Sequence, residues 1–139
     1  MTWLRIRDGV ADAGFLTFDL RDVLRALGPD ALGWTWTVSA VEENGQTLEA
    51  VGEGLADLGT LERSGERVAD SRLVQIAERI HQVIWGEFRA YRDRIAAEPS
   101  VRVVAFDASF YEVWCDDDAA IARLRAAFKE TELVTAAAP

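Results

Sequence analysis

Apolar and polar positions alternate at the start of the chain and then change to a helical spacing. Residues 3–7 read WLRIR, which is the two-residue period of a half-buried strand. Residues 18–27 place apolar side chains three and four positions apart, which predicts an amphipathic helix with Asp19 as its N-cap. Gly28-Pro29 predicts the end of that helix. The chain therefore opens with a strand and a helix.

The next segment predicts a hairpin followed by an irregular stretch. Residues 34–39 alternate Trp or Val with Thr or Ser, and Asn44-Gly45 favours a tight two-residue turn. We therefore expect a hairpin over residues 42–51. Residues 52–70 contain four glycines and no clear period, which predicts a loop. A short strand or a helical turn at residues 55–61 is the alternative.

The longest periodic pattern begins at Ser71. Apolar residues recur at helical spacing as far as Ile95, and Pro99 ends the run, so the pattern predicts one helix of about 25 residues. Gly86 lies in its middle and lowers helix stability by about 1 kcal/mol relative to Ala. The expected compensation is the close approach of a neighbouring element.

The last third predicts a second hairpin and a final helix. Residues 101–106 and 110–115 read as strands around residues 107–109, and residues 119–128 read as a helix. We expect residues 135–139 to be a frayed tail. The whole pattern predicts an α+β fold: one domain over residues 1–134, with an antiparallel sheet built from hairpins and packed against one long helix and two shorter ones.

The composition indicates in which cellular compartment the protein is expected. Half of the 139 residues are hydrophobic, so a sizeable core is expected. No apolar stretch approaches the roughly 20 residues of a membrane span, and the N-terminus lacks the apolar region of a signal peptide. Cys115 is the only cysteine. Together these features favour a cytoplasmic protein with no membrane contact, and the preference for Arg over Lys is typical of a GC-rich bacterial genome.

The net charge restricts the possible partners. Twenty-four acids against 15 bases give −9, which argues against binding a nucleic-acid backbone by bulk attraction. Such a charge either keeps the protein soluble or recognises a protein partner with a basic surface.

Three consecutive aspartates, residues 116–118, come immediately before the last helix. Acids at this position cap free backbone N–H groups and oppose the positive end of the helix dipole. A metal site would need Asp107 and Glu112 to converge on them, and an acidic patch for a protein is the third interpretation. Glu112 is in phase with Phe110 and Trp114, so it lies either on an apolar face or at a solvated sheet edge. The predicted partner-binding acids are Asp107, Glu112, Asp116, Asp117, Asp118, Glu42 and Glu43.

No motif for catalysis or cofactor binding is present. His81 is the single histidine, and no serine or cysteine motif accompanies it. The aspartates after Cys115 disfavour its thiolate, and Cys115 with His81 gives at most two zinc ligands. The glycines of residues 52–59 match no phosphate-binding loop. We therefore expect no cofactor, metal or catalytic residue, although distant carboxylates can assemble a site that no local motif reveals.

Three hypotheses follow. The first is a non-enzymatic acidic protein-binding module, such as an immunity or inhibitor protein that occupies the basic surface of a bacterial toxin or enzyme. The second is a small-molecule binding domain or weak enzyme with a pocket between sheet and long helix. Its lining would comprise Trp34, Trp36, His81, Trp85 and Trp114. The third is a structural subunit or homodimer that associates through the long helix; otherwise the chain is a monomer.

Overall fold

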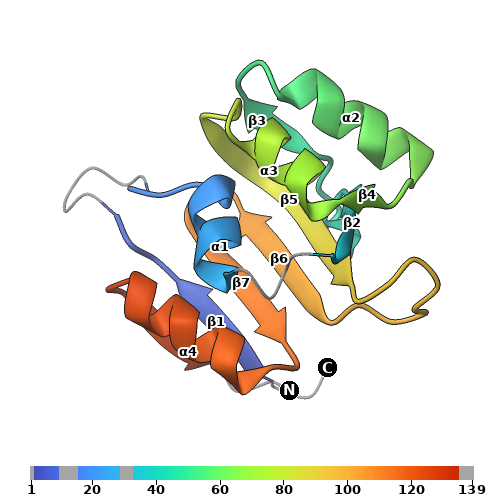
Figure 1. Cartoon of the computed structure of the whole chain (residues 1–139). Coiled ribbons are helices and arrows are strands. Elements are labelled where there is room, and N and C mark those ends of the chain that lie inside the picture. Colours follow the sequence, from blue (N-terminus) through green and yellow to red (C-terminus); the bar gives the residue numbers. More distant parts are fainter. Residues whose placement is uncertain (1, 10–15, 29–32, 135–139) are drawn as a thin grey trace.

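An antiparallel sheet with helices on one face forms the body of the molecule (Figure 1). The structure is a computed structural model and describes residues 2–9, 16–28 and 33–134. The sheet has eight strands in the order β4-β2-β5-β6-β7-β1-β8, and β3 pairs with β5 outside this order. Its strands are β1 (Thr2–Ile6), β2 (Thr35–Ser39), β3 (Glu49–Val51), β4 (Val68–Ala69), β5 (Gln82–Tyr91), β6 (Val101–Phe106), β7 (Phe110–Cys115) and β8 (Thr131–Val134). The helices described are α1 (Leu20–Leu27), α2 (Leu55–Ser64), α3 (Asp70–Ala77) and α4 (Asp118–Ala127). The predicted α+β class and antiparallel sheet are confirmed.

The core lies between the sheet and the helices. Alternate residues of the central strands point toward the helices and are buried, as Leu4 and Ile6 of β1 show with no exposed surface. The same alternation buries Tyr111 and Val113 of β7. Helix α1 adds Leu20, Val23, Leu24 and Leu27 to the same cluster. The intervening strand residues point to the other side of the sheet.

The predicted long helix over residues 71–95 is wrong beyond Ala77. Helix α3 ends at Ala77, and residues 82–91 form β5. This strand pairs with β2 and β3 on one edge and with β6 on the other. Because both faces of β5 carry partly or fully buried side chains, its apolar residues do not alternate strictly and imitate a helical period. Hydrogen bonds to strands on both edges satisfy the backbone N–H and C=O groups of β5, and this pairing outweighs the local helical propensity of the segment.

Gly86 does lie at a close approach, as its position in the pattern predicted. A Cβ added there would come within 3.2 Å of Leu48 Cδ1 and of Val83 Cγ1. The space is therefore filled by side chains from β5 itself and from the segment before β3. The compensation for this glycine is packing in a strand rather than in a helix.

The hairpin predicted over residues 42–51 is also wrong, although its turn exists. Gly45 has a positive φ of 67°, and Val41 and Gln46 form one isolated bridge. Strands β2 and β3 do not pair with each other; both pair with the same edge of β5. Residues 40–48 thus connect two strands that pair with the same edge of the ten-residue β5. That long edge offers more hydrogen bonds than a local hairpin does.

Most of the remaining local predictions are confirmed. Strand β1, the β6–β7 hairpin and helix α4 form where the pattern placed them, and α1 has Asp19 as its N-cap and ends before Gly28, whose φ is 85°. Residues 55–64 form α2, so the helical alternative for the irregular stretch is confirmed. Strand β8 was not predicted, and the expected frayed tail lies outside the described residues.

No helix in the described ranges is both long enough and apolar enough to cross a membrane.

Candidate functional site

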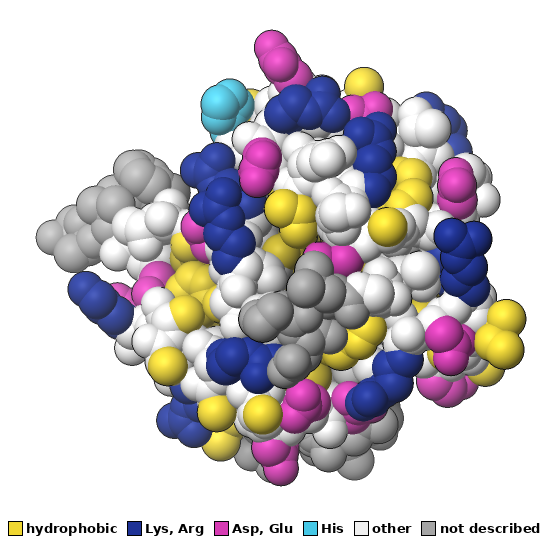
Figure 2. All heavy atoms as spheres, viewed as in Figure 1, with side chains coloured by type: hydrophobic (Ala, Val, Ile, Leu, Met, Phe, Trp, Pro, Cys, Tyr) yellow, Lys and Arg dark blue, Asp and Glu magenta, His cyan; other side chains and the backbone are white. Residues whose placement is uncertain are grey.

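The side of the sheet that faces away from the helices carries an unusual set of side chains. We call it the open face and define it by the outward-pointing residues of β5, β6, β7, β1 and β8. All described helices lie on the other side of the sheet (Figure 1). Figure 2 shows that helix side, where acidic and basic side chains are interspersed. The open face differs because it combines aromatic rings with arginines.

The strand register arranges the open face in three rows that cross the strands. One row contains Arg89, Arg102, Trp114 and Trp3. The middle row contains Glu87, Val104, Glu112, Arg5 and Glu132. The third contains Trp85, Phe106 and Phe110, with Arg7 above the last ring. Directly opposed residues of neighbouring strands have Cβ atoms about 5 Å apart, so side chains within a row touch.

Ion pairs fix the middle of the open face. Arg5 donates from Nε to Glu112 Oε2 at 2.8 Å, and its Nη2 lies 2.6 Å from the same oxygen. Arg102 donates from Nε and Nη2 to the Glu87 carboxylate at 3.0 and 3.2 Å, and Arg89 donates to it as well. Glu87 is only 3% exposed. Two guanidinium groups therefore offset the desolvation of this carboxylate, which costs several kcal/mol for an isolated ion.

The charge of Glu87 also acts on Arg89. Burial by itself lowers the pKa of Arg89, but the hydrogen bond and the charge of Glu87 more than offset this effect, so the pKa is raised. The arginine consequently stays charged. Arg89 and Arg102 are therefore held on the Glu87 carboxylate by ion pairs, and Glu43 is a further acidic neighbour of Arg102.

Aromatic rings flank these ion pairs on both sides. Trp3 and Trp114 lie 6.3 Å apart between ring centroids. Phe106 stacks on Phe110 at 4.9 Å and meets Trp85 edge-on at 6.0 Å. All five rings are half-buried. Guanidinium groups cover some of them, with Arg5 4.8 Å from the Phe110 centroid and Arg102 5.3 Å from that of Trp3.

The charges of the open face balance. On its strands, Arg5, Arg89 and Arg102 stand against Glu87, Glu112 and Glu132. Three positive and three negative side chains leave this surface neutral, although the whole chain carries −9. At its border, Arg7 lies 3.5 Å from Glu132, and Glu43 lies 3.4 Å from Arg102. The excess negative charge therefore lies elsewhere on the molecule.

The structure separates the predicted partner-binding acids from one another. Glu112 is at the centre of the open face, and Glu42 and Glu43 lie in the turn Glu42–Asn44 beside it. Asp107 is exposed in the β6–β7 turn. Asp116, Asp117 and Asp118 lie at the opposite end of β7, roughly 20 Å from Asp107 for a six-residue strand. The seven acids do not form one surface.

The three consecutive aspartates have local roles at the start of α4. Asp117 is the N-cap and accepts a hydrogen bond from the Ala119 N–H at 2.9 Å, and Asp118 is in the first turn. Asp116 accepts from Arg92 Nη2 at 2.9 Å. Burial raises the pKa of the neighbouring Cys115 thiol, against a hydrogen bond from the Asp117 N–H, so its thiolate is disfavoured. No group of three or more potential metal ligands occurs among the described residues.

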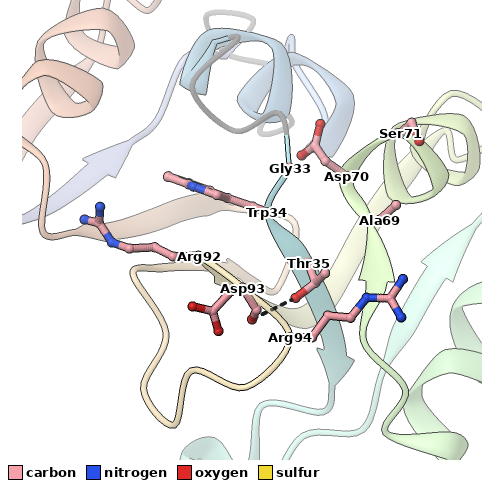
Figure 3. Close-up of a pocket in the computed structure, with 9 residues that line it drawn as sticks. All are labelled: Gly33, Trp34, Thr35, Ala69, Asp70, Ser71, Arg92, Asp93 and Arg94. Carbon is pink, nitrogen blue, oxygen red and sulfur yellow. Dashed lines mark hydrogen bonds between the residues drawn. The ribbon is translucent and has the colours of Figure 1, made fainter.

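The five residues predicted to line one pocket are also separated. Trp85 and Trp114 belong to the open face, and His81 is exposed at the start of β5. Trp36 is fully buried beneath α3, where its indole N–H donates to Asp70 Oδ1 at 2.8 Å. Trp34 lines a cavity near the start of β2 (Figure 3).

The hydrophobic pattern did not predict a surface role for Trp3, Phe106, Phe110 or the arginines of the open face. One signal was available. In β1, alternation places Trp3 and Arg5 on the face opposite the buried aliphatic residues. In β7, it does the same for Phe110, Glu112 and Trp114. Bringing these two sets together requires the strand order, which places β1 beside β7 although more than 100 residues separate them.

No protein-family model, no curated protein and no solved structure matches the chain, so its function is inferred from these surfaces alone.

Proposed function

We propose that the chain is a non-enzymatic protein-binding module that docks a basic partner protein on its open face. The observation that carries the proposal is the set of five half-buried aromatic rings interleaved with paired arginines on a sheet face that no described helix covers. Trp, Tyr and Arg dominate the energetics of protein interfaces, because large rigid side chains bury much area at little entropic cost.

The shape of the open face favours a protein over a small molecule. Five strands spaced about 4.8 Å apart and three rows of side chains give a surface of roughly 20 by 15 Å. Small ligands need concave sites that enclose most of their surface. The cavity at the border of the open face, beside Glu87 and Arg89, holds only about 160 Å³, which is below the roughly 300–1,000 Å³ of small-ligand sites. An area of about 300 Å² instead corresponds to the centre of a standard protein interface, which buries about 800 Å² on each partner. The surrounding turns would supply the rim.

Charge favours a basic partner over a second copy of the chain. Two molecules of charge −9 repel each other, whereas a basic protein is attracted over a distance of about a Debye length, roughly 8–10 Å. Glu42, Glu49 and Asp107 are exposed at the border of the open face, and none has an ion-pair partner among the described residues. An immunity or inhibitor protein of a bacterial toxin or enzyme would use such a surface to cover a basic substrate site.

The aromatic contribution can be tested with the pair Trp3→Thr and Trp114→Thr. Thr retains strand propensity but removes both rings, so the sheet persists while the expected contact area is lost. Tagged protein should capture a stoichiometric basic partner from lysate of its source cells. Loss of one hot-spot ring weakens binding by at least about 30-fold, measured by calorimetry with the purified partner.

The matched control is Ile95→Ser, which removes an apolar side chain that is 91% exposed in the loop after β5. This variant should bind like the wild type. Equal binding by the aromatic variants and the control would contradict the proposal. So would a doubled mass in light scattering that the aromatic variants abolish, because a second copy would then occupy the face.

The acids can be tested as two competing groups with equal charge change. The variant Glu42→Gln, Glu49→Gln and Asp107→Asn should slow association and flatten its salt dependence, with little effect on dissociation. The variant Asp116→Asn, Asp117→Asn and Asp118→Asn removes three charges at the other end of β7. It should change the association rate less than the first variant does. If the second variant has the larger effect, the basic partner approaches the start of α4 instead.

A further inference from the structure

Strand β8 forms one edge of the sheet and lies beside the open face, to which its Glu132 belongs. Within the described part of the chain, β8 pairs with β1 only. We propose that this edge accepts an extended strand of the basic partner, in which basic side chains alternate with apolar ones. The inference deepens the proposed function and rests on it for the basic character of the partner.

The register shows which backbone groups of β8 point outward. The Arg7 N–H donates to the Glu130 carbonyl at 2.9 Å, so these two residues continue the β1–β8 register as a hydrogen-bonded pair. Hydrogen-bonded and non-hydrogen-bonded pairs alternate in an antiparallel ladder, so the backbone of Glu132 also faces β1. Thr131 and Leu133 therefore direct their N–H and C=O groups away from β1. These outward groups have no hydrogen-bond partner among the described residues.

The other edge strands are less suited to pairing with a second chain. Strand β4, at the opposite end of the strand order, has two residues. Strand β3 has three residues, and its register with β5 shifts between Glu49 and Ala50. Short strands and bulges are common devices that prevent a sheet edge from pairing with another chain. Strand β8 instead has four residues in continuous register with β1 and contains no proline.

Contacts to β1 and to the segment after it hold β8 in place. The Asp8 carboxylate accepts a hydrogen bond from the Glu130 N–H at 2.6 Å, just before the strand begins. Glu132 Oε1 lies 3.4 Å from Arg5 Nη1 and 3.5 Å from Arg7 Nε. An added strand would therefore meet an edge that is already ordered, which lowers the entropic cost of binding.

The side chains of β8 select the sequence of the added strand. Glu130 and Glu132 are exposed and point to the side of the open face. Glu130 has no ion-pair partner among the described residues, and both ion pairs of Glu132 use Oε1, which leaves Oε2 for another cation. Leu133 lies opposite the buried Leu4 on the helix side and is 52% exposed. The complementary strand has basic residues opposite the two acids and an apolar residue opposite Leu133.

The same edge disfavours a second copy of the chain. Two β8 strands related by a two-fold axis satisfy all the outward groups when Thr131 of one copy lies opposite Leu133 of the other. This register places the Glu132 side chains of the two copies directly opposite each other, and like charges in that position are destabilising. Glu132 therefore favours a basic strand over self-association.

The test uses the synthetic strand acetyl-TVKVK-amide as a probe. The probe is titrated into ¹⁵N-labelled protein, and the backbone amide signals are followed by NMR. The Thr131 and Leu133 signals should shift saturably with a dissociation constant on the order of 1 mM, because their N–H groups become hydrogen-bonded. The Glu132 N–H faces β1, so its signal should shift less.

Matched probes separate strand pairing from general charge attraction. The two probe valines pair with Thr131 and Leu133, so N-methyl groups on both valines remove hydrogen bonds and should weaken binding at least about tenfold. N-methyl groups on both lysines point away from β8 and should leave the affinity unchanged. The acidic probe acetyl-TVEVE-amide should bind at least about tenfold more weakly than the basic probe.

Protein variants test the two acids of the edge. The double variant Glu130→Gln and Glu132→Gln should bind acetyl-TVKVK-amide about fivefold more weakly, since two exposed ion pairs are lost. The double variant Glu53→Gln and Glu66→Gln is the charge-matched control, because both residues are exposed and flank α2. It should bind the probe like the wild type.

Equal affinity of the two N-methylated probes would overturn the proposal, as would the absence of a saturable shift at about ten times the expected dissociation constant. So would Thr131 and Leu133 signals that change with protein concentration together with a doubled mass, because a second copy would then occupy the edge. The probe is monitored through amides of β8, and the proposed function is tested with Trp3 and Trp114. Either proposal can therefore fail without the other.

Discussion

Asp19 shows how the burial of one side chain links the fold to pH. It is the N-cap of α1 and lines a cavity with Leu16 and His81. Burial raises the pKa of this carboxyl to about 6; the charge of Arg21 opposes the rise, that of Asp22 adds to it, and His81 opposes it. The buried hydroxyl of Tyr111 is a further titratable group that interacts with Asp19.

The substitution Asp19→Asn should remove a pH dependence of stability. The folded-state pKa exceeds the unfolded value of about 3.9, so the folded protein takes up a proton between roughly pH 4 and 6. This contribution is fully present below pH 4 and is lost as the pH rises through 6. After an allowance for solvent screening of a half-buried group, it amounts to about 1 kcal/mol. Asn remains a good N-cap, so the variant should be more stable than the wild type at pH 7.

The measurement is urea unfolding at several pH values from 4 to 7. Asp118→Asn is the control, because Asp118 occupies the first turn of α4 and is exposed. It should retain the wild-type slope of unfolding free energy against pH between 4 and 6. The same slope in Asp19→Asn would contradict the assignment.

Single residues also show the limit of sequence analysis at the site. The pattern around Glu112 left open whether it lies on an apolar face or at a solvated edge. Its side chain is 14% exposed among aromatic neighbours, and Arg5, 107 positions away, neutralises it. Local spacing predicted the phase of Glu112 but not this partner, because the contact depends on β1 and β7 being neighbours.

At the level of elements, the β6–β7 turn contains a local strain. Asp107 and Ala108 have φ angles of 50° and 56°, the left-handed values that a type I′ turn requires at both central positions, and the Ser109 N–H closes the turn on the Phe106 carbonyl at 2.8 Å. Asp tolerates this conformation better than Ala does. Two sets of contacts hold the turn in this conformation. One is the hydrogen-bonded pairing of β6 with β7, and the other is a hydrogen bond from the Ala108 N–H to the Ile84 carbonyl at 3.1 Å.

Ala108→Gly should therefore stabilise the protein by about 0.5–1 kcal/mol, since Gly adopts a positive φ without steric cost. Ala122→Gly is the opposite control, because residue 122 is exposed within α4, where Gly destabilises by about 1 kcal/mol. Chemical denaturation compares both with the wild type. A loss of stability in Ala108→Gly would show that the turn does not carry this strain.

Elements with a clear local signal were predictable from sequence, and elements that depend on tertiary pairing were not. Helix α1 has an N-cap and a terminating Gly, and the β6–β7 hairpin has two apolar strands around a short turn. Strand β5 has neither a helix cap nor a short turn to mark where it begins and ends. Its conformation is decided by three partner strands, so its valine and aromatic content was a better guide than its apparent period.

At the scale of the whole molecule, the sheet separates two surfaces. Helices and core occupy one side, and the other side presents aromatic rings held by balanced ion pairs in a chain of charge −9. The proposed function therefore divides the work between two groups of side chains. The acids at the border would attract a basic partner at long range, and the aromatic centre would provide the short-range contact. Substitutions at the border should therefore change association rates, and substitutions at the centre should change dissociation rates.

The most direct test follows all five indole N–H signals while the purified partner is added to ¹⁵N-labelled protein. Docking on the open face predicts that Trp3, Trp85 and Trp114 shift or broaden together, because all three lie on that surface. Trp36 in the core and Trp34 in the cavity should not respond. A complex that forms while the three open-face signals stay unchanged would contradict the proposed binding surface.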